Sequence, residues 1–360
     1  MKSGIFKRPS TVKKVFSALG AAVIVCLFFG CSVRESASEV PAAAPTAKPF
    51  ETARPFETAP PVTGSPQAAR PSAAPTASPA KNPAQPDKLV SEKRDLLVLM
   101  MAYPGYITGV EKSSGGSIYA VMKSGKKILY DDKKKKTFDE KMADADLQDS
   151  LSIIYRLGGN GTLPEGNHDP GRIRPYALIK DVYGDTENEV LNNLAKADIG
   201  AQKADFNKRN GALKALEAVF KELNALCSND PDVKYSVYPL SGTFNYRYIS
   251  GTELLSMHSF GIAVDLHAAV NPSFRTATRE EGQKRIDSFP SGIVRVFEDH
   301  GFIWGGKWAH FDIMHFEYRP EIILKAKYQM RPKKEQPWYY GFPDTEDVKK
   351  YIRAIDGALG

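Results

Sequence analysis

The chain has 360 residues, a formal net charge of +7, 42% hydrophobic residues and three cysteines. This length and apolar content suit an ordinary globular core, organised as one large domain or two small ones that pack together. The chain contains neither a phosphate-binding loop nor a pattern of interleaved basic and aromatic residues, so nucleic acid is not an expected partner.

Residues 1–31 have the pattern of an export signal. A lysine-rich start precedes the apolar run Val15 to Phe29, which is too short to cross a bilayer comfortably, and Gly30 and Cys31 close the segment. A cysteine at this junction resembles the cleavage site of bacterial lipoproteins, so Cys31 is the predicted lipidation site. An uncleaved signal anchor is the alternative. Both interpretations predict an exported protein held at a membrane, facing the periplasm or the cell wall.

Residues 32–90 are rich in alanine and proline and poor in large apolar side chains. Such a segment cannot bury enough surface to offset its ordering entropy, and its prolines keep it extended. We therefore predict a disordered tether between the lipid anchor and the folded part. Only Cys227 then remains in the mature body, which excludes an intramolecular disulfide.

The folded part mixes helical and strand patterns. Residues 91–200 form a predicted N-terminal α+β region of unassigned role, with a hairpin at 118–130 and a helix at 146–157. Residues 201–345 form a predicted second domain, and residues 346–360 a tail or helix. In the second domain we expect helices at 213–226 and 293–300 and extended segments at 235–239, 261–266 and 310–318. The absence of a regular βαβ repeat predicts an α+β fold, a mainly antiparallel sheet with flanking helices.

Two short segments carry most of the chemistry. His258 and Asp265 lie seven residues apart, and Asp312 and His315 lie three apart. Two imidazoles and one carboxylate can fill three corners of a zinc tetrahedron and leave the fourth for water, while the second carboxylate acts as general base. A surface ion pair is the simpler interpretation of each segment. However, four of the six histidines fall in or beside them: His258, His267, His310 and His315.

The combined pattern Ser-x-His-x-x-Gly-x-Ala-x-Asp and Asp-x-x-His resembles that of the zinc D-alanyl-D-alanine carboxypeptidases and dipeptidases of the VanY kind. The same family includes L-alanyl-D-glutamate endopeptidases found among phage endolysins. The resemblance covers about residues 244–318. It implies a hedgehog-like zinc peptidase domain with one zinc ion per chain, held by His258, Asp265 and His315.

The resemblance also implies catalytic roles. Asp312 falls on the family's catalytic carboxylate, which takes a proton from the attacking water, and Arg247 falls where the family places an arginine that polarises the substrate carbonyl. Ser256 is expected beside the ligands or the substrate. The resemblance assigns no role to His267 and His310, and both are expected beside the ligands. Aromatic side chains are expected to wall the site, namely Trp304, Trp308 and Phe311.

The expected substrate is the peptide stem of peptidoglycan. D-alanyl-D-alanine carboxypeptidase is the first hypothesis, and L-alanyl-D-glutamate endopeptidase is the alternative, because Asp312 stands where many relatives carry glutamate. A zinc amidase acting on another exported amide and a non-catalytic zinc-containing lipoprotein that binds the cell wall are further readings. The intact Asp312 favours an enzyme. The scissile bond, the membrane concerned and the oligomeric state stay open.

Overall fold

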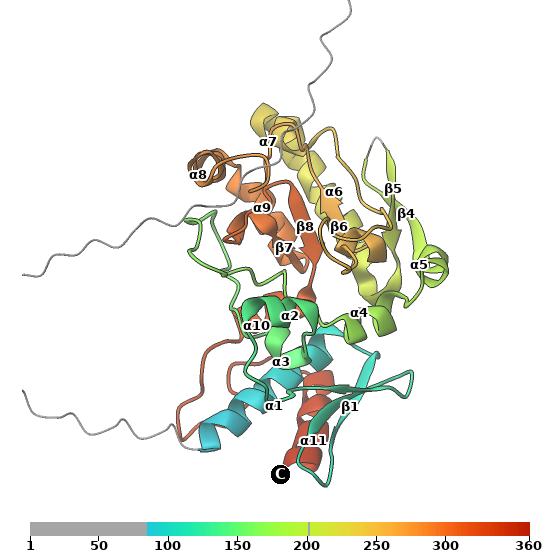
Figure 1. The fold of residues 1–360 in the computed structure, drawn as a ribbon, viewed down its shortest axis with the longest axis vertical. Coiled ribbons are helices and arrows are strands. Elements are labelled where there is room, and N and C mark those ends of the chain that lie inside the picture. Colours follow the sequence, from blue (N-terminus) through green and yellow to red (C-terminus); the bar gives the residue numbers. More distant parts are fainter. Residues whose placement is uncertain (1–84, 201) are drawn as a thin grey trace, which may run out of the picture. The chain divides into compact units, whose positions relative to one another are not determined.

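The computed structural model describes residues 85–200 and 202–360, which belong to one compact unit. The predicted export signal, Cys31 and the tether up to residue 84 lie outside the described residues. Helices alternate with small antiparallel sheets, which fits the α+β class (Figure 1). The domain boundaries at 200 and 345 stay predictions. Within the described part, no helix has the length and apolar content of a membrane span.

The first sheet packs against two helices, one from each end of the described chain. Its order is β1-β2-β3, with β1 at Ile107–Lys112, β2 at Ile118–Met122 and β3 at Lys127–Leu129, which confirms the predicted hairpin. Helix α1 (Gln85–Ala102) contacts α10 (Pro320–Lys327) and α11 (Glu346–Leu359). The α1 helix therefore begins inside the predicted tether, and residues 346–360 are largely helical. The Lys93 ammonium of α1 donates to the Asp356 carboxylate of α11 at 2.7 Å, and this contact links the two helices.

Short elements connect this sheet to the rest of the chain. They are α2 (Phe138–Ala143), α3 (Leu147–Ser150), α4 (Tyr176–Tyr183), α5 (Glu187–Asn193), the hairpin β4 (Leu194–Asp198) and β5 (Lys203–Asn207), and the turn η1 (Arg209–Gly211). The helix predicted at 146–157 is wrong beyond Ser150. Beyond Ser150 a tertiary contact replaces the helix: the Tyr155 hydroxyl donates to the distant Glu298, 2.7 Å away.

The third sheet has the order β6-β8-β7, with β6 at Ala263–Asp265, β8 at His315–Tyr318 and β7 at Phe302–Trp304. The strands of residues 85–200 and 202–360 thus form three separate sheets, not the single main sheet predicted. Phe316 of β8 stacks on Phe297 of helix α9 (Ser291–Asp299), with ring centroids 3.8 Å apart. Helix α6 (Ala212–Asn229) contacts α9 and buries the face that carries Phe220. Both predicted helices in this region are confirmed.

The remaining helices of the third-sheet region are α7 (Pro231–Val237), η2 (Met257–Phe260), α8 (Arg279–Ser288) and η3 (Gly305–Lys307). The strand predicted at 235–239 is wrong, since most of it belongs to α7. Asp230 caps this helix by accepting two backbone N–H groups, and Pro231 occupies its first turn. Cys227 near the end of α6 is a half-buried free thiol whose pKa is raised by burial.

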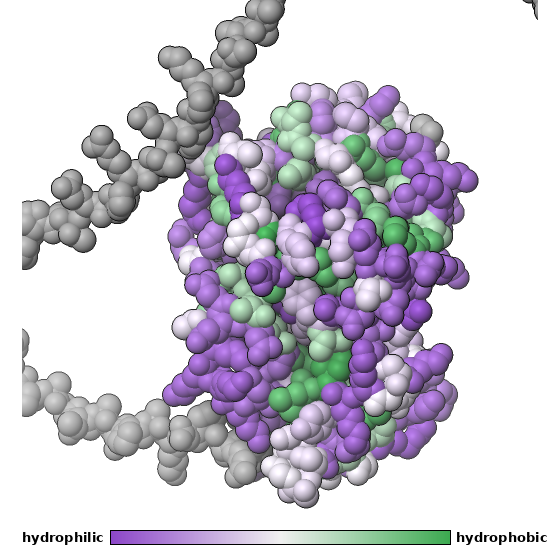
Figure 2. Space-filling view, turned by 45° about the vertical axis from the view of Figure 1, so that its right-hand side comes forward, coloured by the Kyte–Doolittle hydropathy of each residue, from purple (hydrophilic) through white to green (hydrophobic). Residues whose placement is uncertain are grey.

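Figure 2 shows a largely hydrophilic surface broken by small hydrophobic areas. The large apolar side chains that are exposed come from separate segments of the described chain: Leu191, Tyr235, Tyr248, Met330, Tyr339 and Tyr340. Scattered exposure of this kind is normal for a folded protein. The surface composition therefore does not by itself locate a functional site.

Candidate active site

Strand pairing brings two of the predicted ligands together. Asp265 of β6 lies directly opposite His315 of β8 in the antiparallel ladder, and Ala263 lies opposite Glu317. Residues in directly opposite positions project to the same face with their Cβ atoms a few ångströms apart. The 50 residues that separate Asp265 from His315 in sequence are thus bridged by one cross-strand pair, and the small Ala263 leaves room for the Glu317 carboxylate.

The third predicted ligand comes from the turn η2. Ser256 caps this turn, and its hydroxyl accepts the backbone N–H of His258 at 3.3 Å. Gly261 ends it in the left-handed conformation at φ +64°, and a Cβ there would lie 2.6 Å from Leu194. Gly261 serves the turn and the packing against β4.

The three side chains converge in a buried place. His258 Nε2 lies 3.1 Å from one oxygen of Asp265, and His315 Nδ1 lies 2.8 Å from the other. The two ring nitrogens are 3.2 Å apart. His258 is 3% exposed and His315 7%, so little water competes for these atoms. The side chains of His258, Asp265 and His315 therefore form one potential ligand group.

The opposite ring nitrogens have partners that orient both imidazoles. His258 Nδ1 donates to the carbonyl of Thr243 at 2.5 Å, and His315 Nε2 donates to the carboxylate of Glu317 at 3.0 Å. Each ring is thereby held in the tautomer whose free nitrogen faces Asp265. Two imidazole nitrogens oriented in this way, together with one carboxylate, fit a zinc site with an open fourth position.

The local electrostatics favour a cation. Burial acts to raise the pKa of Asp265, but hydrogen bonds from His258 and His315 lower it well below its ordinary range. Burial acts to lower the pKa of His315, and Asp265 together with Glu317 raises it to about 10. The carboxylates that stabilise a proton on this imidazole would equally stabilise a metal ion at the same place.

Asp312 lies close enough to this group for the charges of His315 and Asp265 to act on its pKa, which burial raises. One carboxylate oxygen of Asp312 is buried without a hydrogen-bond partner in the described chain. The backbone around it is tightly fitted, because Asp312 N–H donates to Gly305 at 2.9 Å and a Cβ on Gly305 would lie 2.5 Å from the Asp312 carbonyl oxygen. A half-buried carboxylate with one buried, free oxygen near the ligand group has the features of a general base.

Arg247 is anchored beside η2 by its backbone. Its N–H donates to the hydroxyl of Ser259 at 2.9 Å, and the same hydroxyl donates to the Arg247 carbonyl at 2.7 Å. The side chain is exposed and makes no hydrogen bond or ion pair with the described residues. Ser259, which the sequence interpretation missed, thus positions the segment that carries Arg247.

Residues 168–174 contribute side chains that the sequence interpretation did not assign to the site. Buried Asp169 accepts the backbone N–H of His310 at 2.9 Å and its Nδ1–H at 2.6 Å. Arg174 forms an ion pair with Glu317, the partner of His315. In the sequence, residues 168–174 show only a cluster of charged residues around a Pro-Gly turn, and this pattern does not indicate a specific chemistry.

The predicted aromatic wall is only partly correct. Trp308 packs edge-on against His315, with ring centroids 5.8 Å apart. Trp304 instead stacks on Phe289 in the core and donates its indole N–H to a backbone carbonyl. Phe311 packs against Gly282 of α8, where a Cβ would lie 2.4 Å from the ring. His267 hydrogen-bonds to the carbonyl of Tyr235 at 2.8 Å and has no hydrogen bond to the three ligands within the described ranges.

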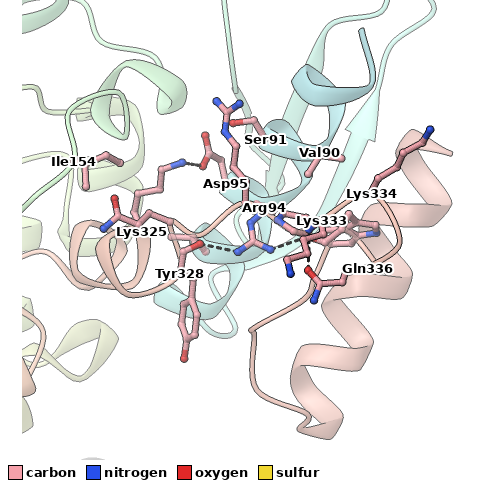
Figure 3. Close-up of a pocket in the computed structure, with 15 residues that line it drawn as sticks. Val90, Ser91, Arg94, Asp95, Ile154, Lys325, Tyr328, Lys333, Lys334 and Gln336 are labelled. Carbon is pink, nitrogen blue, oxygen red and sulfur yellow. Dashed lines mark hydrogen bonds and ion pairs between the residues drawn. The ribbon is translucent and has the colours of Figure 1, made fainter. Parts of the chain in front are cut away.

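A separate cavity of about 690 Å³ lies between α1, α10 and the segment that follows α10 (Figure 3). Its buried cations already have partners. The Arg94 guanidinium donates to the carbonyls of Tyr328 and Trp338, each at 2.7 Å, and Lys325 forms an ion pair with Asp95. The Arg94 contacts hold the segment after α10 against α1. Because Arg94, Lys325 and Asp95 already have partners, none of the three is free to act as the acid or base that hydrolysis needs.

A second acidic group, Asp131, Asp132 and Asp146, also has metal-like spacing. The Lys136 ammonium already lies among these carboxylates, 2.9 Å from Asp132 and 3.6 Å from Asp146. The cation of this cluster is therefore a lysine of the same chain.

The comparison with known families agrees with the site geometry. Residues 250–318 match the family model described as D-alanyl-D-alanine carboxypeptidase, and this segment contains His258, Asp265, Asp312 and His315. No curated protein and no solved structure matches the chain. The match indicates a peptidase. Over residues 250–318, this chain is thus similar to the D-alanyl-D-alanine carboxypeptidase family.

Proposed function

We propose that the chain is a zinc-dependent D-alanyl-D-alanine carboxypeptidase acting on the stem peptides of peptidoglycan. The observation that supports this most strongly is the buried group His258, Asp265 and His315 inside the family-matched segment, with Asp312 beside it. The proposed ligands of the single zinc ion are these two imidazoles and the Asp265 carboxylate. When bound, zinc would supply Lewis-acid polarisation and make water acidic enough to react at neutral pH.

The residues of the chain then have separate tasks. Glu317 and the Thr243 carbonyl hold the two imidazoles in one tautomer. The free oxygen of Asp312 takes the proton of the attacking water and later gives it to the leaving amine. Arg247 would have to turn its exposed side chain toward the substrate carbonyl to stabilise the negative charge that develops there.

The test of this mechanism separates metal binding from proton transfer. Asp312→Asn should keep the fold and the zinc but lower turnover by about 10²- to 10⁴-fold, because an amide cannot accept the proton. His258→Ala and His315→Ala should abolish zinc binding. Metal content and release of D-alanine from a synthetic pentapeptide are measured for all three variants. Normal turnover in Asp312→Asn, or full zinc occupancy in both histidine variants, would contradict the assignment.

A second function is supported by one residue. Asp312 stands where the carboxypeptidases of this family often carry glutamate, and in this the chain resembles the L-alanyl-D-glutamate endopeptidases. The same pentapeptide assay distinguishes the two, because cleavage after L-alanine gives different products from release of D-alanine.

We further propose that the protein is an exported lipoprotein anchored through Cys31. The basic N-terminus, the apolar run and the Gly30-Cys31 junction support this, and the alanine- and proline-rich segment up to residue 84 would give the folded part its reach toward the wall. Peptidoglycan peptide and the membrane are then its partners.

A further inference from the structure

Three arginines lie near the candidate active site, and the half-buried Arg172 differs from the buried Arg174 and Arg319. Arg174 forms an ion pair with Glu317, and Arg319 forms one with Glu321. Arg172 has no hydrogen-bonded carboxylate among the described residues, and its Nε atom is buried without a partner. Its nearest ion-pair contact is Asp169 at 4.0 Å, a carboxylate already occupied by His310.

Two aromatic rings and one backbone carbonyl contact the guanidinium of Arg172. It lies over the ring of Trp308 and over the ring of Phe274, at 5.2 Å from each centroid. One of its nitrogens donates to the carbonyl of His310 at 2.8 Å. Contacts with two rings and a single backbone hydrogen bond leave other N–H groups of the guanidinium without an acceptor among the described residues.

The position of this cation relates it to the chemistry. Trp308 contacts both Arg172 and the proposed ligand His315, so one indole ring lies next to the guanidinium and to the ligand group. The charge of Arg172 acts on the pKa of Asp312, which places the two side chains in the same electrostatic environment. The Arg172 side chain is 18% exposed, so part of it is open to solvent.

Burial of Arg172 is only partly compensated. Burial lowers its pKa from the ordinary value, Arg174 adds to this, and Asp169, Asp312 and Glu317 oppose it. Buried charges in proteins are normally paired, and an arginine fork matches a carboxylate with two parallel hydrogen bonds. A partly exposed guanidinium that lacks such a partner is suited to receive one from the ligand.

We propose that Arg172, held by Trp308 and Phe274, binds the free C-terminal carboxylate of the substrate. This inference rests on the proposed function and adds a recognition subsite from a segment outside the family match. In this proposal Arg172 gives the enzyme its preference for the C-terminal end of the substrate peptide, while Arg247 stays available for the reacting carbonyl. The subsite would make the enzyme discriminate between a terminal D-alanine and an internal peptide bond.

The test compares two substrates with the zinc-loaded full chain. One is an acetylated pentapeptide ending in D-Ala-D-Ala with a free carboxylate, and the other is its C-terminal amide. Arg172→Gln should lower kcat/KM for the acid by about 10- to 100-fold, mainly through KM, since a hydrogen bond to a charged group is lost. The amide should be cleaved almost as before, and Arg172→Lys should restore part of the preference for the acid.

Arg275 is the matched control, because its exposed side chain lies over Phe274 at 5.5 Å without the buried contacts of Arg172. Arg275→Gln should leave both substrates unaffected. Equal losses for acid and amide in Arg172→Gln, or an acid-selective loss in Arg275→Gln, would overturn the proposal. Zinc content and thermal unfolding of Arg172→Gln and Arg172→Lys verify that both variants are folded.

A binding measurement separates this inference from the proposed function. The full chain with Asp312→Asn is titrated with the acid and with the amide peptide, and binding is measured by calorimetry. The subsite is supported if the acid binds more tightly than the amide and if this difference disappears in the double variant Asp312→Asn, Arg172→Gln. This holds even if the wild-type chain cleaves neither peptide. Equal binding of the two peptides, or no binding of either, contradicts it.

Discussion

Glu317 is predicted to control the affinity for zinc without being a ligand. It is fully buried, accepts the Nε2–H of His315 at 3.0 Å and forms an ion pair with Arg174. Burial acts to raise its pKa, but Arg174 and His315 lower it far below the ordinary value, so it is ionised at neutral pH. Glu317→Gln keeps the size of the side chain and removes the charge that raises the basicity of His315.

The expected magnitude follows from this contact. Loss of a carboxylate that orients a ligating histidine costs about 10- to 100-fold in metal affinity, or about 1.4–2.7 kcal/mol. The substitution also leaves Arg174 without its ionised partner, and breaking a buried ion pair costs up to about 3–5 kcal/mol of stability. Glu317→Gln retains one acceptor oxygen, so its cost in stability should be lower than this limit.

The assay is competition for zinc between the full chain and a chelator of known affinity, at a pH near 7. Asp169→Asn is the control, because Asp169 orients His310 in the same way but does not contact a proposed ligand. It should leave the zinc affinity unchanged. An unchanged affinity in Glu317→Gln, or an equal loss in Asp169→Asn, would refute the reasoning that the hydrogen bond to His315 matters for the metal.

Two further predictions concern acid stability and anchoring. Burial acts to raise the pKa of Asp132, but Lys134 and Lys136 lower it to about 2, so its contribution to stability is complete above about pH 4 and is lost as the pH falls toward 2. The difference in Tm between the wild type and Lys136→Met should therefore be larger at pH 5 than at pH 2.5, and a constant difference would contradict this origin. Cys31→Ser should release the protein from the membrane fraction or leave its signal uncleaved, measured by fractionation and mass. Unchanged attachment with normal processing would argue against a lipid anchor.

Local patterns in the sequence were sufficient for some elements and misleading for others. The apolar spacing of α6 and α9 predicted both helices, because a helix that buries one face repeats its apolar residues every three or four positions. Alternation at 235–239 predicted a strand, although Asp230 and Pro231 start a helix there. The predicted helix at 146–157 was wrong in its second half, where Tyr155 is bound by Glu298 from a distant segment.

The candidate site shows the same division. The spacing of His258 and Asp265, and of Asp312 and His315, indicated a zinc hydrolase from the sequence alone, since ligands on short adjacent elements keep a readable spacing. Only the tertiary structure decided which side chains orient and surround them: Asp169, Arg172, Arg174 and Glu317. Three of these come from a turn more than 80 residues before His258, at 169–174. Contacts between such distant segments depend on how the whole core packs, and no local period in the sequence records them.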